Sequence, residues 1–382
     1  MIPELRGAFN EIFTPEKYRA FLSLLDERCG THVNFRICET PCFFPAPLIE
    51  TMQTAGAELI RQLVQNEPYL KAARQQIPPG FRVQNEPARP MFIQVDFGLV
   101  RDERGQLAPR LVEIQAFPSL YAYQPILEKT YCDAYGLTVR GQSHHEELFR
   151  RAILGGHAPE NVVLLEIDPY HQKTLPDFLL TAKATGIRIA DIRDVRKTGR
   201  KLYLDGIPIE RIYNRAIADE LVRLDVHADF RFDDDLDVEW AGHPNWFFLI
   251  SKFSLPYLKH PTVPESWFLH KTNPIPDDLE NYVLKPLYSF AGLGVKVGPT
   301  RADIDSIPEA ERPHYLLQRR MQFEPIIETP FGPTQAEIRV MYIWVDELTP
   351  VSLIVRMGRG KMMGVDHNRD KEWVGASAAF LA

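Results

Sequence analysis

Residues 91–121 read MFIQVDFGLVRDERGQLAPRLVEIQAFPSLY, and this stretch decides the fold. Two apolar runs rich in β-forming residues, Met91 to Val100 and Arg110 to Ala116, flank a polar segment that contains Gly105. Apolar runs on either side of a short polar turn predict a β-hairpin. We therefore expect two adjacent antiparallel strands here.

Each strand of this hairpin carries one acidic residue among apolar neighbours, Asp96 in the first and Glu113 in the second. A carboxylate inside a strand resists burial unless a cation or a donor compensates it, so the pair indicates a shared cation. Because side chains alternate along a strand, Gln115 projects from the same face as Glu113. Two carboxylates and an amide oxygen form a hard oxygen set that suits magnesium holding a nucleotide phosphate.

The chain has 382 residues, of which 45% are hydrophobic and 25% are charged. This length and composition predict a globular protein of two or three domains. The net charge of −7 argues against a general nucleic-acid surface. No apolar run approaches the roughly 20 residues that span a bilayer, and the start MIPELRGAFNEIF is too charged for a signal peptide. The expected location is therefore the cytoplasm. The cysteines lack a metal-binding spacing and are expected to be buried free thiols: Cys29, Cys38, Cys42 and Cys132.

A β-α-β order follows the hairpin region, with a strand over Asn161–Ile167, a helix over Thr174–Thr185 and a strand from Ile187. This order predicts a small parallel α/β domain. No G-x-G-x-x-G follows its first strand, so no dinucleotide site is expected. We expect five parts: N-terminal helices and the metal-binding hairpin strands in 1–154, the small α/β domain in 155–220, a linker with a lysine-bearing segment in 221–281, the glycine-loop segment in 282–320 and the C-terminal strands in 321–382.

A second chemical segment, residues 282–297, reads YVLKPLYSFAGLGVKV. A strand that ends near Lys285 runs into a loop with Ser289, Gly292 and Gly294, and then into a second strand. Glycines let backbone amides turn toward phosphate oxygens, and Lys285 supplies a charge that reaches the same phosphates. By itself, the segment is equally compatible with an ordinary hairpin tip that carries a surface lysine.

A third segment holds Arg339 within AEIRVMYIW and Arg356 within VSLIVRM. An arginine in an apolar strand is costly unless it faces a cavity or an anion, and a pair pointing inward is the usual means of stabilising phosphoryl charge. Asn368, in the polar run that follows, is expected to face the site, with surface exposure as the alternative. The residues after this run are expected to be helical.

The order of these segments resembles that of the ATP-grasp superfamily of ATP-dependent ligases: a lysine strand, a glycine loop, the segment LLQRR, a strand with E-I-R and a strand with an arginine. That family closes with an Asp strand and a Glu-x-Asn strand. The counterparts here, QVDFGLV and LVEIQAFPS, stand near the beginning of the chain. This displacement is similar to the arrangement of eukaryotic-type glutathione synthetases. The resemblance implies an α/β (α+β) fold, namely a circularly permuted ATP-grasp with an inserted small parallel α/β domain. In such a fold, 1–154 would supply the displaced metal-binding strands of the core, 282–320 the lid and 321–382 the remaining core.

Carried over to this chain, the resemblance assigns Asp96, Glu113 and Gln115 to Mg²⁺. It assigns the glycine loop, Lys285 and a second lysine, Lys252, to the phosphates of ATP. Gln115 stands where the family has asparagine, and the loop carries no acidic residue. Glutathione synthesis itself is therefore not implied.

The resemblance also implies an adenine hinge formed by backbone groups of Gln318 and its neighbours. Arg339 and Arg356 would face the transferred phosphoryl group. The carboxylates of the hairpin should then lie close to Lys285 and to both arginines, despite their separation along the chain.

We therefore expect an ATP- and magnesium-dependent ligase that joins a small-molecule carboxylate to an amine through an acylphosphate. Two alternatives stay open: a phosphotransferase of the same fold, and a nucleotide-binding protein without catalysis. No nucleic-acid or membrane partner is expected. The oligomeric state is open, with a homodimer among the options, and the sequence does not specify either substrate.

Overall fold

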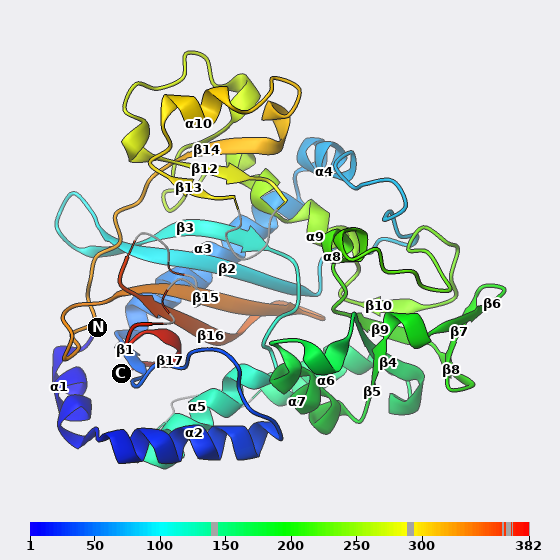
Figure 1. Cartoon of the computed structure of the whole chain (residues 1–382), viewed down its shortest axis with the longest axis horizontal. Coiled ribbons are helices and arrows are strands. Elements are labelled where there is room, and N and C mark those ends of the chain that lie inside the picture. The colour runs from blue at the N-terminus through cyan, green and yellow to red at the C-terminus, as the bar shows by residue number, and fades with distance from the viewer. Residues whose placement is uncertain (139–143, 289–293, 361–362, 364–367, 369, 382) are drawn as a thin grey trace.

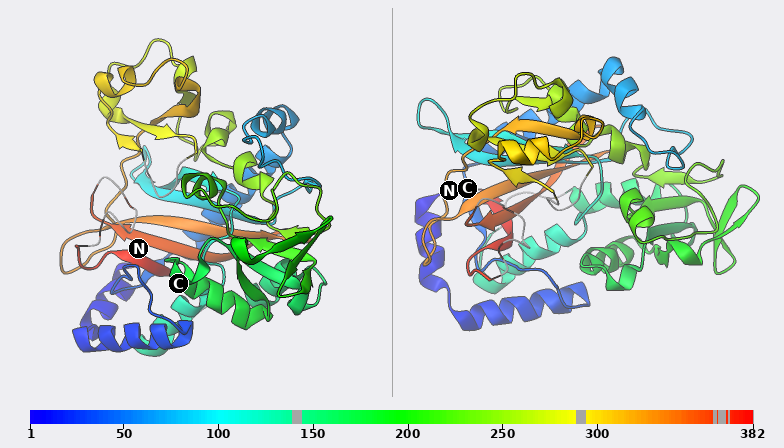
Figure 2. Two further views of the ribbon diagram at one scale, coloured as in Figure 1. Left: turned by 45° about the vertical axis from the view of Figure 1, so that its right-hand side comes forward. Right: turned by 45° about the horizontal axis from the view of Figure 1, so that its top comes forward.

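The computed structural model describes residues 1–138, 144–288, 294–360, 363, 368 and 370–381. It is a mixed α/β structure whose body is a large central sheet (Figure 1). A small parallel sheet lies to one side of the central sheet. An antiparallel sheet with α10 (Arg301–Asp305) lies above the central sheet in this view. Figure 2 shows the same three parts from two further directions.

The central sheet has the strand order β1-β17-β16-β15-β2-β3. Strands from the first third of the chain therefore pair with strands from its end. The predicted hairpin is confirmed as β2 and β3, with Asp96 opposite Glu113, and β15 places Arg339 opposite Asp96. The strands are β1 (Cys42–Phe44), β2 (Phe92–Arg101), β3 (Leu107–Gln115), β15 (Gln335–Trp344), β16 (Leu348–Gly358) and β17 (Gly375–Leu381).

Helices cover both faces of the central sheet. α3 packs against β2, β3 and β15 on one face, where Val95, Val340 and Val355 belong to the main hydrophobic core. α5 and α6 pack on the sheet as well, α5 against β16 and β17 and α6 against β15. The helices of this region are α1 (Pro3–Ile12), α2 (Pro15–Cys29), α3 (Ala46–Val64), α4 (Glu67–Arg74), α5 (Tyr123–Tyr135) and α6 (His145–Leu154).

The predicted β-α-β unit is confirmed as part of a parallel sheet with the order β10-β9-β4-β5. β4 is buried along its whole length, as expected for a parallel strand covered on both faces. A small antiparallel sheet, β6-β7-β8, projects from this unit (Figure 1). The elements are β4 (Val162–Glu166), α7 (Leu175–Thr185), β5 (Arg188–Asp191), β6 (Arg196–Thr198), β7 (Lys201–Leu204), β8 (Ile207–Ile209), β9 (Arg211–Asn214), α8 (Ala218–Arg223) and β10 (Glu239–Ala241).

The antiparallel sheet has the order β11-β14-β12-β13 and contains the lysine strand. We call it the lid sheet. The chain enters it from the central region through α9 and a 3₁₀ helix, η4, and leaves it toward β15. These elements are α9 (Asn245–Leu249), η4 (Lys252–Tyr257), β11 (Ser266–Phe268), β12 (Tyr282–Pro286), β13 (Lys296–Val297) and β14 (Tyr315–Arg319).

The prediction of a helix at the C-terminal end is wrong, because residues 375–381 form β17, which lies between β1 and β16. The run GASAAFL contains alanines, whose intrinsic preference is helical. All of it except Leu381 is buried, and packing within a sheet overrides so weak a preference.

Two further expectations concern cysteines and membranes. All four cysteines are free and buried, as predicted. None of the helices in the described part of the chain combines the length and the apolar character needed to cross a bilayer.

Asp177 of α7 joins the small parallel sheet to the loop that follows β3. Its fully buried carboxylate accepts the backbone N–H groups of Leu120, Ala122 and Tyr123. Its Oδ2 also lies 3.2 Å from Nη1 of Arg215. These partners compensate the burial of the charge, and they fix the loop relative to the parallel sheet.

Replacing Asp177 by asparagine should lower the free energy of unfolding by about 3 kcal/mol, because Arg215 would keep a buried charge without its partner. Chemical denaturation measures this change. The matched control is Asp225→Asn, at a side chain that is 89% exposed, and it should change stability by less than about 0.5 kcal/mol. Equal stabilities for the two variants would contradict the role given to Asp177.

Candidate functional site

Polar side chains gather around Asp96 on one face of the central sheet. Side chains alternate along a strand, so Gln94 and Asp96 share a face of β2, and Glu337 and Arg339 share a face of β15. The register places Gln115 opposite Gln94. Residues directly opposite each other on neighbouring strands are in contact distance, so the sheet itself assembles this cluster.

The guanidinium of Arg339 lies at the centre of the cluster. Its Nε and Nη2 donate to the two oxygens of Asp96, at 2.6 and 2.7 Å, and its Nη1 donates to Oε1 of Gln94 at 2.9 Å. The amide of Gln115, with its oxygen toward the guanidinium, accepts from Nη2 and Nη1 at 3.0 and 3.2 Å. Nη2 also lies 3.8 Å from Oε1 of Glu113. A planar fork with several donors suits this arrangement in a way that a lysine does not.

Arg356 adds a second guanidinium beside the first. Its Nη2 donates to Oδ2 of Asp96 and lies 2.7 Å from Oε1 of Glu337. Burial opposes the ionisation of Asp96, but the charges and hydrogen bonds of Arg339 and Arg356 hold its pKa below the ordinary value. Burial raises the pKa of Glu337 to about 7, against the charge of Arg356. Asp96 is therefore the carboxylate that the two arginines keep ionised.

The shared cation predicted from Asp96 and Glu113 is an arginine in this structure. Both oxygens of Asp96 are bonded to guanidinium groups, and the Gln115 amide contacts Arg339. The magnesium contacts assigned to these two residues remain predictions. Glu113 differs, because its side chain is 25% exposed and Arg339 approaches it only to 3.8 Å. Its carboxylate fits a metal ion. Within the described part of the chain, no three His, Cys, Asp or Glu side chains lie close enough to hold one by themselves.

Two lysines from other elements lie beside this cluster. Lys285 on β12 is 7% exposed, and its Nζ donates to the backbone oxygen of Val112 at 3.1 Å, which joins the lid sheet to the central sheet. Burial lowers the pKa of Lys285 to about 8; Glu113 opposes this shift and the charge of Lys252 adds to it. Lys252, at the start of η4, is also buried. Two neighbouring ammonium groups attract an anion more strongly than one does.

The predicted closeness of the hairpin carboxylates to Lys285 and to both arginines is confirmed by these contacts. Both guanidinium groups are bonded to carboxylates within the protein, although the buried Nε of Arg356 has no hydrogen-bond partner among the described residues. The face formed by Lys285, Lys252 and Glu113 combines cations with a partly exposed carboxylate, which is the chemistry that binds an anion together with a divalent cation.

The glycine loop is described only in part. Ser289 and Gly292 lie outside the described residues. Gly294 has a φ of +73° at the turn into β13, and a Cβ there would lie 2.9 Å from the ring of Pro286. Glycine therefore closes this end of the loop without strain.

Gln318 and Asn368 are both buried and bonded within the protein. Gln318 lies in β14 between β11 and β12, so its backbone groups belong to the sheet, and its Nε2 donates to Oγ of Ser266 at 3.2 Å. Oδ1 of Asn368 accepts from the N–H of Arg359 at 3.2 Å and from Nζ of Lys371 at 3.3 Å. These contacts stabilise the lid sheet and the turn after β16. The nucleotide contacts assigned to both residues remain predictions.

The sequence reasoning missed Gln94 and Glu337. The alternation of side chains along a strand, which placed Gln115 on the same face as Glu113, could have identified both residues. Each stands two positions before a predicted site residue. Gln94 precedes Asp96 in QVD, and Glu337 precedes Arg339 in EIR. The same rule places each pair on one face.

No family model and no curated protein matches this chain. Among solved structures, the chain is similar to a glutathione synthetase-like effector (GSS30) from Globodera pallida, determined in its apo form. The two have a TM-score of 0.61 and 13% sequence identity, over 97% of this chain and 99% of that chain. The likeness shows that this chain has a glutathione synthetase-like fold along nearly its whole length.

Asp96→Asn should lower the free energy of unfolding by about 3 to 5 kcal/mol, because it leaves two guanidinium groups without their buried partner. Glu113→Gln, on the neighbouring strand, is the matched control and should change stability by less than about 1 kcal/mol. Chemical denaturation of both variants measures the difference. A Glu113→Gln variant as unstable as Asp96→Asn would overturn the assignment of Asp96 as the structural carboxylate.

Proposed function

We propose that this protein is an ATP-dependent carboxylate–amine ligase with a circularly permuted ATP-grasp fold. The observation that carries the proposal is the position of Lys285. This buried lysine of the lid sheet donates to the strand that bears Glu113, beside a second buried lysine, Lys252. The order of the segments along the chain and the glutathione synthetase-like fold support it.

The lysines are proposed to bind the phosphates of ATP between the lid sheet and β3. A polyphosphate would bring negative charge to both ammonium groups, which attract it more strongly together than either does alone. Lys285 is well suited to this task, because its compact charge reaches a phosphate from a rigid strand. The lid sheet would cover the nucleotide and keep water from the reacting atoms.

Glu113 is proposed as the protein ligand of magnesium. Magnesium in nucleotide sites is commonly held by one or two carboxylates together with the phosphates, so a single open carboxylate is sufficient. When bound, the ion would neutralise phosphate charge. Asp96 and Gln115 would act behind Glu113, by holding Arg339 in place.

The proposed reaction has two steps. A substrate carboxylate attacks the γ-phosphate of ATP, which gives an acylphosphate and ADP. An amine then attacks the acyl carbon and displaces phosphate, which leaves an amide. The first step joins two anions, so this chain contributes positioning and positive charge through Lys285, Lys252 and Arg356, with Arg339 fixing the inner carboxylate.

A second candidate is a nucleotide-binding protein without catalysis. The specific observation in its favour is that Arg339 is bonded to Asp96 and contacts Gln115, two of the three residues expected to hold magnesium. Such a protein would bind ATP through the same lysines and would not turn it over.

The two candidates are separated by an assay of ADP release with a panel of amino acids, peptides and polyamines, followed by mass spectrometry of the products. An amide product supports the ligase. A stable phosphorylated product contradicts it in favour of a phosphotransferase, and tight ATP binding without ADP release supports the non-catalytic protein.

Lys285→Gln should weaken ATP binding at least tenfold at pH 7, because it removes a buried charge from the proposed phosphate site. Lys296→Gln is the matched control in the same sheet, since Lys296 is exposed and pairs with Asp303, and it should change binding less than about twofold. Isothermal titration calorimetry measures both. Equal affinities for the two variants would place the phosphates elsewhere.

The pKa of Lys285, lowered to about 8 by burial, predicts a pH dependence. Lys285 is charged below that value and neutral above it, so ATP should bind more weakly as the pH rises from about 7 to about 9. The Lys285→Gln variant should lack this dependence. A wild-type affinity that does not change over this range would contradict the assignment.

A further inference from the structure

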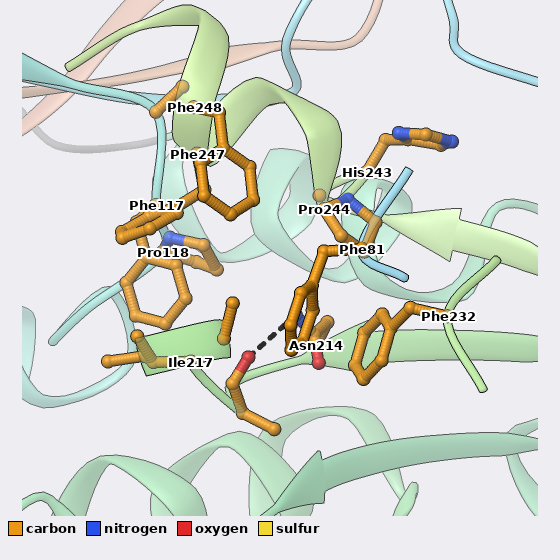
Figure 3. Close-up of a pocket in the computed structure, with 14 residues that line it drawn as sticks. Phe81, Phe117, Pro118, Asn214, Ile217, Phe232, His243, Pro244, Phe247 and Phe248 are labelled. Atoms are coloured by element: carbon orange, nitrogen blue, oxygen red, sulfur yellow. Dashed lines mark hydrogen bonds between the residues drawn. The ribbon is translucent and has the colours of Figure 1, made fainter. Parts of the chain in front are cut away.

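A separate pocket lies where the small parallel sheet meets the loop that follows β3 (Figure 3). The centre of a water-sized sphere can occupy about 20 Å³ of it, and the wider space between the lining atoms, which includes open solvent, is about 420 Å³. Residues that follow the carboxyl ends of β9 and β10 form one side, and ligands of parallel α/β sheets bind at such ends. The opposite side comes from the loop after β3 and from α9.

The walls of this pocket are aromatic. Phe117 and Phe247 meet edge to face, with ring centroids 5.8 Å apart, and Phe81 and Phe232 are tilted with centroids 5.9 Å apart. Figure 3 shows these rings around the cavity, with Phe248 beside Phe247. Aromatic rings bind another ring well through offset and edge contacts, so the walls favour a planar apolar group. We call this cavity the aromatic pocket.

The lining includes no lysine, arginine, aspartate or glutamate. Its histidine, His243, is engaged on both nitrogens: Nε2 lies 2.9 Å from the backbone oxygen of Gln84, and Nδ1 is 3.3 Å from the N–H of Asn245. Burial lowers the pKa of His243, although the Gln84 oxygen opposes the shift. The imidazole is therefore neutral at pH 7, and the pocket is unsuited to a charged group.

Asn214, the last residue of β9, supplies the unsatisfied polar group of the lining. Its side chain is 5% exposed, and its Nδ2 donates to the backbone oxygen of Ala216 at 3.1 Å (dashed in Figure 3). Its Oδ1 has no hydrogen-bond partner among the described residues. A buried acceptor without a donor is unfavourable, so a ligand that supplies an N–H to this oxygen gains affinity and orientation.

The aromatic pocket adjoins the proposed nucleotide site. Phe117 follows Gln115 closely in the chain, and the ring of Phe248 lies 6.1 Å, centroid to centroid, from that of Tyr288 in the lid sheet region. A substrate held in the pocket would therefore lie beside the lysine face. This placement in the reaction rests on the proposed function, whereas the binding chemistry of the pocket does not.

We propose that the aromatic pocket binds a planar aromatic group that carries an N–H, with the ring between the phenylalanines and the N–H donated to Oδ1 of Asn214. The substrate class of the ligase then includes small molecules with such a ring, for example an amino acid or amide that bears an indole. A purely hydrophilic substrate would leave the apolar walls without apolar contacts.

Indole and 1-methylindole test this proposal on the full-length protein, because they share a ring system and differ in the N–H. Isothermal titration calorimetry should give a Kd of about 0.1 to 1 mM for indole, as expected for so small a ligand, and at least fivefold weaker binding for 1-methylindole. Asn214→Leu should remove this preference.

Ala218→Phe, which fills the pocket from its edge, should weaken indole binding at least tenfold. Ala302→Phe, on the exposed face of α10, is the matched control and should leave it unchanged. In the wild-type protein with ¹³C-labelled isoleucine methyl groups, indole should shift the signal of Ile217, a measurement that does not depend on how a variant folds.

The proposal is overturned if indole does not bind at concentrations up to about 10 mM, if Ala218→Phe binds it as tightly as the wild type, or if the Ile217 signal does not move. It is also overturned if both indoles bind equally well. ATP binding is measured on the same samples. Indole binding without ATP binding refutes the nucleotide site alone, and ATP binding without indole binding refutes the aromatic pocket alone.

Discussion

The guanidinium of Arg339 and the carboxylate of Asp96 meet side by side in the central sheet, 243 positions apart in the chain. The pair is buried, so each partner depends on the other to offset the loss of water. It connects β2, from the N-terminal third, to β15, near the C-terminal end. The site depends on this contact, because it fixes β2 relative to β15, and β2 is the hairpin partner of β3, which carries Glu113.

The charged groups around this pair form two layers with different tasks. The inner layer contains Asp96, Arg339 and Arg356, together with Glu337 beside Arg356, and ion pairs within the protein join its members. The outer layer contains Glu113, Lys285 and, beside them, Lys252. Its balance of charge changes when an anion or a cation enters, which is the property that a nucleotide site requires. The inner layer supplies rigidity, and the outer layer supplies the binding chemistry that we propose.

Local patterns predicted the hairpin and the β-α-β unit, because alternation and apolar runs are displayed directly by the sequence. The approach of the hairpin carboxylates to the two arginines was predicted from the family resemblance, since no local pattern brings together segments so far apart in the chain. The contact of Asp96 with Arg339 did not follow, because an acidic residue in an apolar strand indicates a positive charge without specifying which group supplies it. That choice depends on how β15 aligns with β2, and no local pattern reports this register. The strand at 375–381 was missed for a related reason, since its pairing with β1 and β16 outweighs the helical preference of its alanines.

A crystal structure of the protein with magnesium and a non-hydrolysable ATP analogue tests the central claim most directly. The two-layer arrangement predicts magnesium between Glu113 and the phosphates, with Lys285 on the same phosphates and Asp96 still bonded to Arg339. Magnesium bonded to Asp96 with Arg339 displaced, or an analogue bound away from Lys285, would contradict it.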